Sequence, residues 1–190
     1  METQNFELRE WQLSDAKSLA EHANNINIWN SVRDYFPHPY LEEDGKHFIE
    51  MVLNNPHPMR RTVIGQMPIE FFSDLQPPMD FAIVVDGNAV GGIGIVPQKD
   101  VERITAEIGY WLGEKYWNRG IMSEAVKRMV KYAFANFELQ KLYAPVFDFN
   151  IASQKVLQKA GFEREAILKQ AAIKNGKIID MHYYSLFKSI

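Results

Sequence analysis

"YWNRGIMSEAVKRMV", residues Tyr116 to Val130, joins an aromatic run to an apolar pattern with helical spacing. Gly120 lies between them, where the pattern predicts a turn from a strand into a helix. The first backbone N–H groups of a helix have no partner inside it, and the helix dipole favours an anion there. The turn is therefore a candidate phosphate site. A glycine that only makes a tight turn explains this stretch, taken alone, equally well.

The same stretch limits the kind of phosphate ligand. It has neither the lysine of a P-loop nor the three glycines of a dinucleotide-binding turn. A nucleoside triphosphate or a dinucleotide is therefore not predicted. After Gly120, apolar residues recur with the spacing of one face of a helix: Met122, Ala125, Val126, Met129, Val130, Ala133, Phe134 and Phe137. This pattern predicts a long amphipathic helix that faces a core.

The rest of the chain predicts further strands and helices in alternation. Strands are expected at residues 6–11, 104–112, 141–147, 166–174 and 178–188, and a hairpin at 81–97 turns at Asp86-Gly87. Further helices are expected at 16–23, 41–55 (with Phe48, Met51 and Val52 on one side) and 150–161, whereas 24–40 and 56–79 are expected to be loops, the second with a short strand near 62–64. We predict a single domain over residues 1–190, an α/β (α+β) fold with a mixed, mostly antiparallel sheet.

Composition excludes several classes of function. The net charge of −3 provides no overall electrostatic footprint for nucleic acid, and the absence of cysteine excludes disulfides and thiolate metal sites. The five histidines show no metal-ligand spacing, so no metal is expected. The N-terminus is polar, and no apolar run approaches the roughly 20 residues of a membrane span. A soluble cytoplasmic protein, monomer or homodimer, is the expectation.

Pro145 gives an independent indication of a ligand site. Proline cannot donate a hydrogen bond to a sheet, so it is disfavoured in a strand that is paired on both sides. The strand 141–147 is therefore expected to pair poorly along one edge. If it lies beside the strand that ends at Leu112, the two splay apart and expose main-chain groups to a ligand. An edge strand with its proline in water is the alternative.

Three motifs in order carry a resemblance to a known family. They are "AEIGYWL" (106–112), "YWNRGIMSEAV" (116–126) and "NIASQKVLQKAGF" (150–162). Together they resemble the GNAT superfamily of N-acyltransferases, and most closely its RimJ/RimL-type ribosomal-protein N-terminal acetyltransferases. The family pattern Q/R-x-x-G-x-G/A falls on Trp117, Gly120 and Met122, where only the central glycine matches strictly. The resemblance implies a GNAT fold with a splayed strand pair and acetyl-CoA as cosubstrate.

The resemblance also implies roles for individual residues. The main chain at Trp111 and Leu112 would pair with the pantetheine arm of CoA, and Asn150 would hydrogen-bond it. Ser153 would replace, near the sulfur, a family tyrosine whose position here is Leu157. The remaining expected cofactor contacts are the pyrophosphate-binding turn and a lysine for the ribose phosphate: Asn118, Arg119, Gly120, Ile121, Met122, Ser123 and Lys155.

Acyl transfer to an amine also needs a base and an acceptor site. Glu107 lies in the strand leading to the acyl site, where a partly apolar cleft would raise its pKa. A salt-bridged strand glutamate is the alternative. The same resemblance implies an acceptor site between the loop 27–40 and the last hairpin, where Trp29, Asp34, Tyr35 and Phe36 would face Tyr183 or Tyr184. A Pro-rich connector packed against the core is the alternative. The predicted function is acetyl-CoA-dependent acetylation of a primary amine, on a protein N-terminus or a small molecule. A non-catalytic acyl-CoA-binding module is the alternative.

Overall fold

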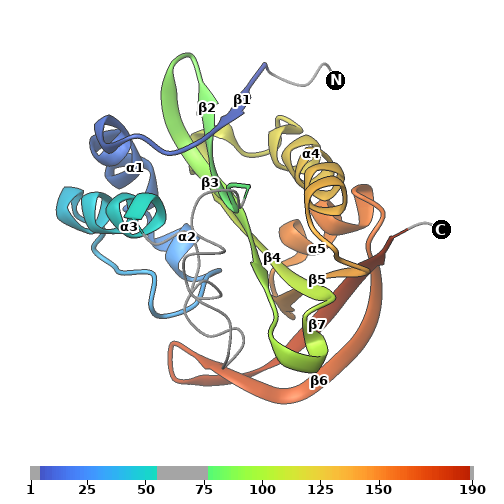
Figure 1. The fold of residues 1–190 in the computed structure, drawn as a ribbon. Helices are drawn as coiled ribbons and strands as arrows, with labels where there is room; N and C mark the ends of the chain where they lie inside the picture. Colours follow the sequence, from blue (N-terminus) through green and yellow to red (C-terminus); the bar gives the residue numbers. More distant parts are fainter. Residues whose placement is uncertain (1–4, 55–76, 189–190) are drawn as a thin grey trace.

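The computed structural model describes residues 5–54 and 77–188, a seven-stranded sheet with helices on both faces (Figure 1). The strands are β1 (Glu7–Arg9), β2 (Asp80–Val85), β3 (Asn88–Pro97), β4 (Thr105–Leu112), β5 (Lys141–Phe147), β6 (Glu163–Lys174) and β7 (Lys177–Phe187). The helices are α1 (Ala16–Ala23), α2 (Ile26–Trp29), α3 (Glu42–Asn54), α4 (Ile121–Asn136) and α5 (Ile151–Lys159). The predicted strand near 62–64 and most of the predicted loop 56–79 lie outside the described residues.

The sheet is mixed, as predicted. Its order is β1-β2-β3-β4-β5-β7-β6, and every neighbouring pair is antiparallel except the parallel pair β4–β5. Helices α1 to α3 lie on one face of the sheet and α4 and α5 on the other (Figure 1). The prediction of an α/β fold with a largely antiparallel sheet is confirmed.

Each face of the sheet has its own core. The larger core contains the side chains of α4 that the helical pattern predicted, including Met122, Val126 and Met129, together with the inward residues of β3, β4 and β5. The smaller core, under α1 and α3, contains Trp11 and Leu19. Because successive side chains of a strand point to opposite faces, β4 contributes Ile108 and Tyr110 to one face and Glu107 and Trp111 to the other.

The structure corrects the predicted helices in two places. The predicted loop 24–40 contains α2, because the Asn25 side chain accepts hydrogen bonds from the backbone N–H groups of Asn27 (2.8 Å) and Ile28 (3.4 Å) and so caps a short helix. In α3, Phe48 and Val52 pack against the smaller core, but Met51, expected on the same side of the helix, does not. Met51 is 50% exposed, whereas Ile49 is fully buried.

Strands β4 and β5 pair over a short stretch and then separate. The paired positions are Thr105–Lys141, Ala106–Leu142 and Glu107–Tyr143, although β4 continues to Leu112 and β5 to Phe147. The expected splayed strand pair is thereby confirmed. We call the space between residues 108–112 of β4 and 145–147 of β5 the strand gap.

Pro145 fits this separation without loss of a hydrogen bond. Backbone N–H donations from Lys188 to the Gln140 carbonyl and from Asp148 to the Asp180 carbonyl show that the even-numbered residues of β5 bond to β7. The main-chain groups of the odd-numbered residues, Pro145 included, therefore face β4. At Pro145 the two strands have already separated. No β4 carbonyl lies there to accept a hydrogen bond, so the missing N–H of Pro145 costs the sheet nothing.

Candidate active site

The turn before α4 presents backbone amides at an exposed helix N-terminus. Gly120 has φ +78° and Asn118 has φ +60°, both in the left-handed region. The first bond of the helix runs from the Glu124 N–H to the Gly120 carbonyl at 3.2 Å. The N–H groups of Ile121, Met122 and Ser123 therefore have no acceptor within the helix. Such a turn has the geometry and partial charge of an anion site.

The side chains of this turn point in two directions. Ile121 and Met122 are 1% and 8% exposed and pack into the larger core. Met122 stands where the family pattern has Gly or Ala, but its side chain points inward and adds no bulk to the outer face of the turn. Asn118 and Arg119 are exposed. The Trp117 indole N–H donates to the Leu112 carbonyl at 2.7 Å and fixes the turn to the end of β4.

The register of β4 determines which main-chain groups line the strand gap. Backbone N–H donations from Gly113 to the Val90 carbonyl and from Gln98 to the Thr105 carbonyl show that odd-numbered residues bond to β3. Trp111 therefore directs its main-chain groups to β3 and not into the gap. Ile108, Tyr110 and Leu112 direct theirs to the gap side, where the Leu112 carbonyl already accepts from Trp117.

Helix α5 starts beside the strand gap, after β5. Its N-cap is Asn150, as predicted, and the Asn150 Oδ1 atom accepts from the Ser153 N–H at 3.1 Å. The Ser153 hydroxyl lies 2.9 Å from the hydroxyl of Tyr110, a residue that the sequence did not single out. Leu157 is fully buried in the core, and Lys155 is exposed on the helix surface.

Glu107 lies on the opposite face of the sheet from this hydroxyl pair. Its Oε1 atom accepts from Arg33 Nη2 at 2.8 Å, so the salt bridge left open by the sequence is present. The two side chains are 26% and 47% exposed, which leaves part of the carboxylate accessible to solvent. Burial and the neighbouring Glu107 charge raise the pKa of Tyr143 to about 12, which keeps that phenol neutral beside the carboxylate.

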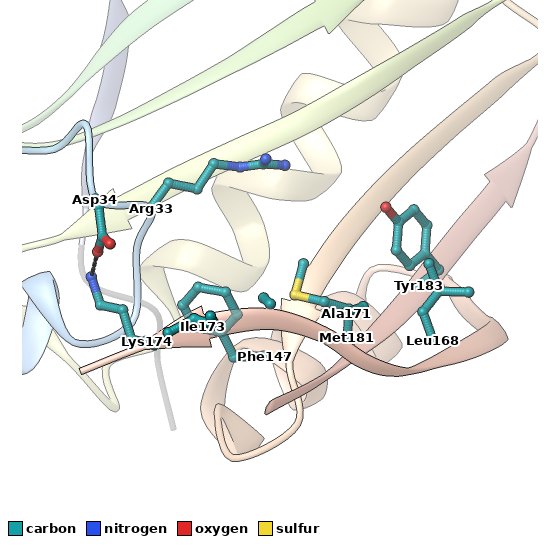
Figure 2. A pocket seen from close by; sticks show the side chains of 10 residues that line it. Arg33, Asp34, Phe147, Leu168, Ala171, Ile173, Lys174, Met181 and Tyr183 are labelled. Carbon is teal, nitrogen blue, oxygen red and sulfur yellow. Dashed lines mark hydrogen bonds and ion pairs between the residues drawn. The ribbon is translucent and has the colours of Figure 1, made fainter. Parts of the chain in front are cut away.

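A pocket of about 260 Å³ lies on the Glu107 face, between the loop after α2 and the β6–β7 hairpin. Figure 2 shows the Asp34–Lys174 ion pair at one end, Tyr183 at the other, and apolar side chains between them. The lining residues are Arg33, Asp34, Phe147, Leu168, Ala171, Ala172, Ile173, Lys174, Met181 and Tyr183. The pairing of β6 with β7 shifts register between Leu168 and Ala172, so the strand is irregular where it lines the pocket.

The structure brings only part of the predicted acceptor set to this pocket. Asp34 lines it, and Asp34 Oδ1 lies 2.7 Å from Nζ of the buried Lys174. Trp29 is not among the lining residues, but its ring contacts Lys174, with the ring centroid 3.7 Å from the same ammonium nitrogen. Phe36 packs against Trp111 on the smaller core, and Tyr35 is 85% exposed.

Of the two candidate tyrosines on β7, Tyr183 lines the pocket. Tyr184 is 1% exposed, and its hydroxyl donates to Gln154 Oε1 on the other face of the sheet. The sequence did not identify Arg33, because its contact with Glu107 joins residues 74 positions apart.

Asp80 is a further carboxylate on the Glu107 face. It pairs in register with Gly94, which pairs in turn with Gly109 of β4. A Cβ atom on Gly94 would lie 2.2 Å from Asp80 Oδ1, so only glycine leaves room for this carboxylate, whereas a Cβ on Gly109 would meet open space. Burial raises the pKa of Asp80 to about 6, with no opposing charge or hydrogen bond from the described residues.

We expect Asp80→Asn to stabilise the protein at neutral pH. The pKa rises from 3.8 to about 6 on folding, so the destabilisation by the carboxylate sets in as the pH rises above about 4 and is complete above about pH 6. The variant should gain roughly 2 to 3 kcal/mol in free energy of unfolding at pH 7.5 and almost nothing at pH 4. Urea denaturation at both pH values measures this, with the exposed Asp100→Asn as control. A loss of stability at pH 7.5 would show that the carboxylate has a partner.

Neither a metal site nor a membrane span is found in the described part of the chain. Residues 5–54 and 77–188 contain no group of three or more His, Asp or Glu side chains arranged to hold an ion. Among the same residues, every helix is too short or too polar to cross a bilayer.

Comparison with known proteins identifies the family. Residues 5–163 match the model of the acetyltransferase (GNAT) domain. An uncharacterized N-acetyltransferase p20 of Bacillus licheniformis is 37% identical over 47% of this chain and 50% of its own length. The ribosomal-protein-serine acetyltransferase of Escherichia coli K12 is 33% identical over 49% of this chain and 53% of its own. The chain thus aligns with about half the length of these relatives.

The fold agrees with this assignment. The solved structure of RimL, a ribosomal L7/L12 alpha-N-protein acetyltransferase in complex with coenzyme A, superposes with a TM-score of 0.76 at 19% identity. The superposition covers 98% of this chain and 95% of that one, so the two share a fold. The strand gap, the amide-lined turn before α4 and the family match lead to one conclusion: the chain belongs to the GNAT family of acetyltransferases.

Proposed function

We propose that this protein is an acetyl-CoA-dependent N-acetyltransferase that transfers the acetyl group directly to a primary amine in a ternary complex. The observation that carries the proposal is the position of the strand gap. It opens after the Glu107–Tyr143 pair and runs toward the amides at the start of α4 that have no acceptor within the helix. A ligand with an amide-containing arm and a pyrophosphate at one end has the chemistry for both.

The cofactor would lie along β4 and end at the turn before α4. The amides of Ile121, Met122 and Ser123 would bind the pyrophosphate, together with the main chain of Gly120 and the exposed side chains of Asn118 and Arg119. The gap-facing main-chain groups of Ile108 and Tyr110 would pair with the pantetheine arm, because those of Trp111 bond to β3. Asn150 and Lys155, at the start and on the surface of α5, would contact the arm and the ribose phosphate.

The reaction then needs a proton acceptor for the amine and a hydrogen-bond donor to the leaving thiolate. Glu107 would take the ammonium proton of the acceptor, directly or through water, from the face of the sheet that also bears the pocket. Ser153 would donate a hydrogen bond to the sulfur from the opposite face. A positioned donor aimed at developing charge contributes a few kcal/mol to a transition state.

The charges around the pocket favour one class of amine. Asp34 in the lining pairs with Lys174, and Glu107 beside the pocket pairs with Arg33 of the lining. A polycationic acceptor such as a polyamine or an aminoglycoside would need an excess of carboxylates, which the described lining does not provide. The apolar wall suits an uncharged substituent. A monoamine with an apolar side chain, such as a peptide N-terminus or a small amine, fits best.

The alternative is an acyl-CoA-binding module without catalysis. Buried Leu157, where many family members have a tyrosine, favours it. Glu107 and Ser153 speak against it, because a binding module requires neither.

CoA release from acetyl-CoA, measured with a panel of peptides, amino acids, polyamines and aminoglycosides, separates the two. Turnover with mass-verified N-acetylation supports the enzyme. Tight CoA binding without turnover would leave the binding module, and no CoA binding would exclude both.

A further inference from the structure

A hydroxyl pair connects β4 to α5 beneath the strand gap. Tyr110 Oη lies 2.9 Å from Ser153 Oγ and 3.4 Å from the Ser153 carbonyl oxygen. Tyr110 follows the last β4–β5 pair, Glu107–Tyr143, and α5 follows β5 along the chain. The pair therefore links the two sides of the gap where the strands have separated, on the face covered by α4 and α5.

The surroundings of Tyr110 keep its hydroxyl protonated, so that it can donate a hydrogen bond to Ser153. Its ring packs against the larger core, and burial raises its pKa well above the usual range, so the phenol keeps its proton. Ser153 is held by its own backbone N–H, which donates to Asn150 Oδ1. The Ser153 hydroxyl has a single proton and can donate it to one acceptor at a time.

We propose that Tyr110 is a positioning residue for the leaving group. Its hydroxyl donates to Ser153 Oγ, which turns the single Ser153 proton toward the thioester sulfur of an acyl-CoA in the strand gap. This inference rests on the proposed function. Without Tyr110 as donor, the Ser153 proton is free to rotate away from the sulfur, and the charge that develops there loses part of its stabilisation.

The reaction balances without a proton from Tyr110. The amine nitrogen bonds to the acyl carbon, the C–S bond breaks, and its electron pair stays on sulfur. The proton of the attacking amine passes to Glu107 or to water. Ser153 donates a hydrogen bond to the thiolate, which is released or takes a proton from solvent. Tyr110 remains a neutral phenol throughout.

Steady-state kinetics of Tyr110→Phe, Ser153→Ala and the double variant test the proposal. Tyr110→Phe should lower kcat about tenfold and change the KM for acetyl-CoA by less than about twofold, since one oriented hydrogen bond is lost from the transition state. Ser153→Ala should lower kcat at least as much. The double variant should match Ser153→Ala alone, because Tyr110 acts only through Ser153.

A matched control separates this role from packing. Tyr132 presents its hydroxyl to the Pro78 carbonyl at 2.8 Å on the same face of the sheet, so Tyr132→Phe should leave kcat unchanged. Full kcat in Tyr110→Phe, a raised KM with unchanged kcat, or losses that multiply in the double variant would each overturn the inference while leaving the proposed function intact. Ser153→Ala with full kcat would overturn it even if Tyr110→Phe did not fold. Absence of turnover in the wild type would overturn both proposals.

Discussion

Replacing Gly120 with glutamate is expected to weaken CoA binding by about a hundredfold or more. The substituted carboxylate would stand at the amides that begin α4, within a few ångströms of the bound pyrophosphate, where repulsion between like charges amounts to several kcal/mol. Isothermal titration with CoA measures the change directly. Because the turn is exposed and lies at the edge of the core, the fold should persist.

The control for this experiment is Gly120→Gln. Gly120 has φ +78°, so any side chain adds strain of roughly 1 to 2 kcal/mol to the turn. Glutamine carries the same strain and nearly the same volume without the charge. Its CoA affinity should lie well above that of the glutamate variant, whereas their melting temperatures should agree. Equal affinities in the two folded variants would refute a phosphate site at this turn.

The second large effect is expected from Glu107→Gln. Loss of a general base typically slows an acyl transfer by about a hundredfold, and the deficit should be greatest at low pH, where less of the acceptor amine is free of its proton. Glutamine can still accept the hydrogen bond from Arg33, so the local geometry is kept. The dissociation constant of CoA should change by less than about twofold. A pH profile of kcat together with CoA titration measures both quantities.

Glu165 provides the matched control for this variant. It is also a strand glutamate in an ion pair, with Lys141 at 2.6 Å, but it lies on β6 outside the pocket lining. Glu165→Gln should leave kcat unchanged at every pH. If Glu107→Gln also proves fully active, the carboxylate serves only its salt bridge, and water is left as the proton acceptor.

The elements of the fold that local chemistry determines could be predicted from the sequence. Helix α1 has the predicted bounds, and Asn150 caps α5 as expected. The predicted hairpin turn at Asp86-Gly87 uses two residues with positive φ, as does the turn at Asn175-Gly176 between β6 and β7. These features depend on a few neighbouring side chains. For the same reason Pro145 predicted the separation of β4 and β5, since its missing N–H is a property of one residue.

The contacts that complete the candidate site could not be predicted in this way. The pairs Arg33–Glu107 and Tyr110–Ser153 join residues 74 and 43 positions apart. Their formation depends on strand register and on the face to which each side chain points, which local periodicity leaves undetermined. The register shifts of β6, between Arg164 and Ala166 and between Leu168 and Ala172, follow no strong turn signal. The predicted strand began at Ala166, three residues after the first residue of β6, Glu163.

The short β4–β5 contact also divides the sheet into two antiparallel blocks, β1 to β4 and β5 to β7. Within each block the strands pair along most of their length, but only three residue pairs of β4 and β5 join one block to the other. Helices α4 and α5 pack across both blocks. Local unfolding begins where cooperative units share the fewest interactions. A cosubstrate that hydrogen-bonds to both strands would couple the blocks, so occupancy of the site and cooperativity of unfolding become thermodynamically linked.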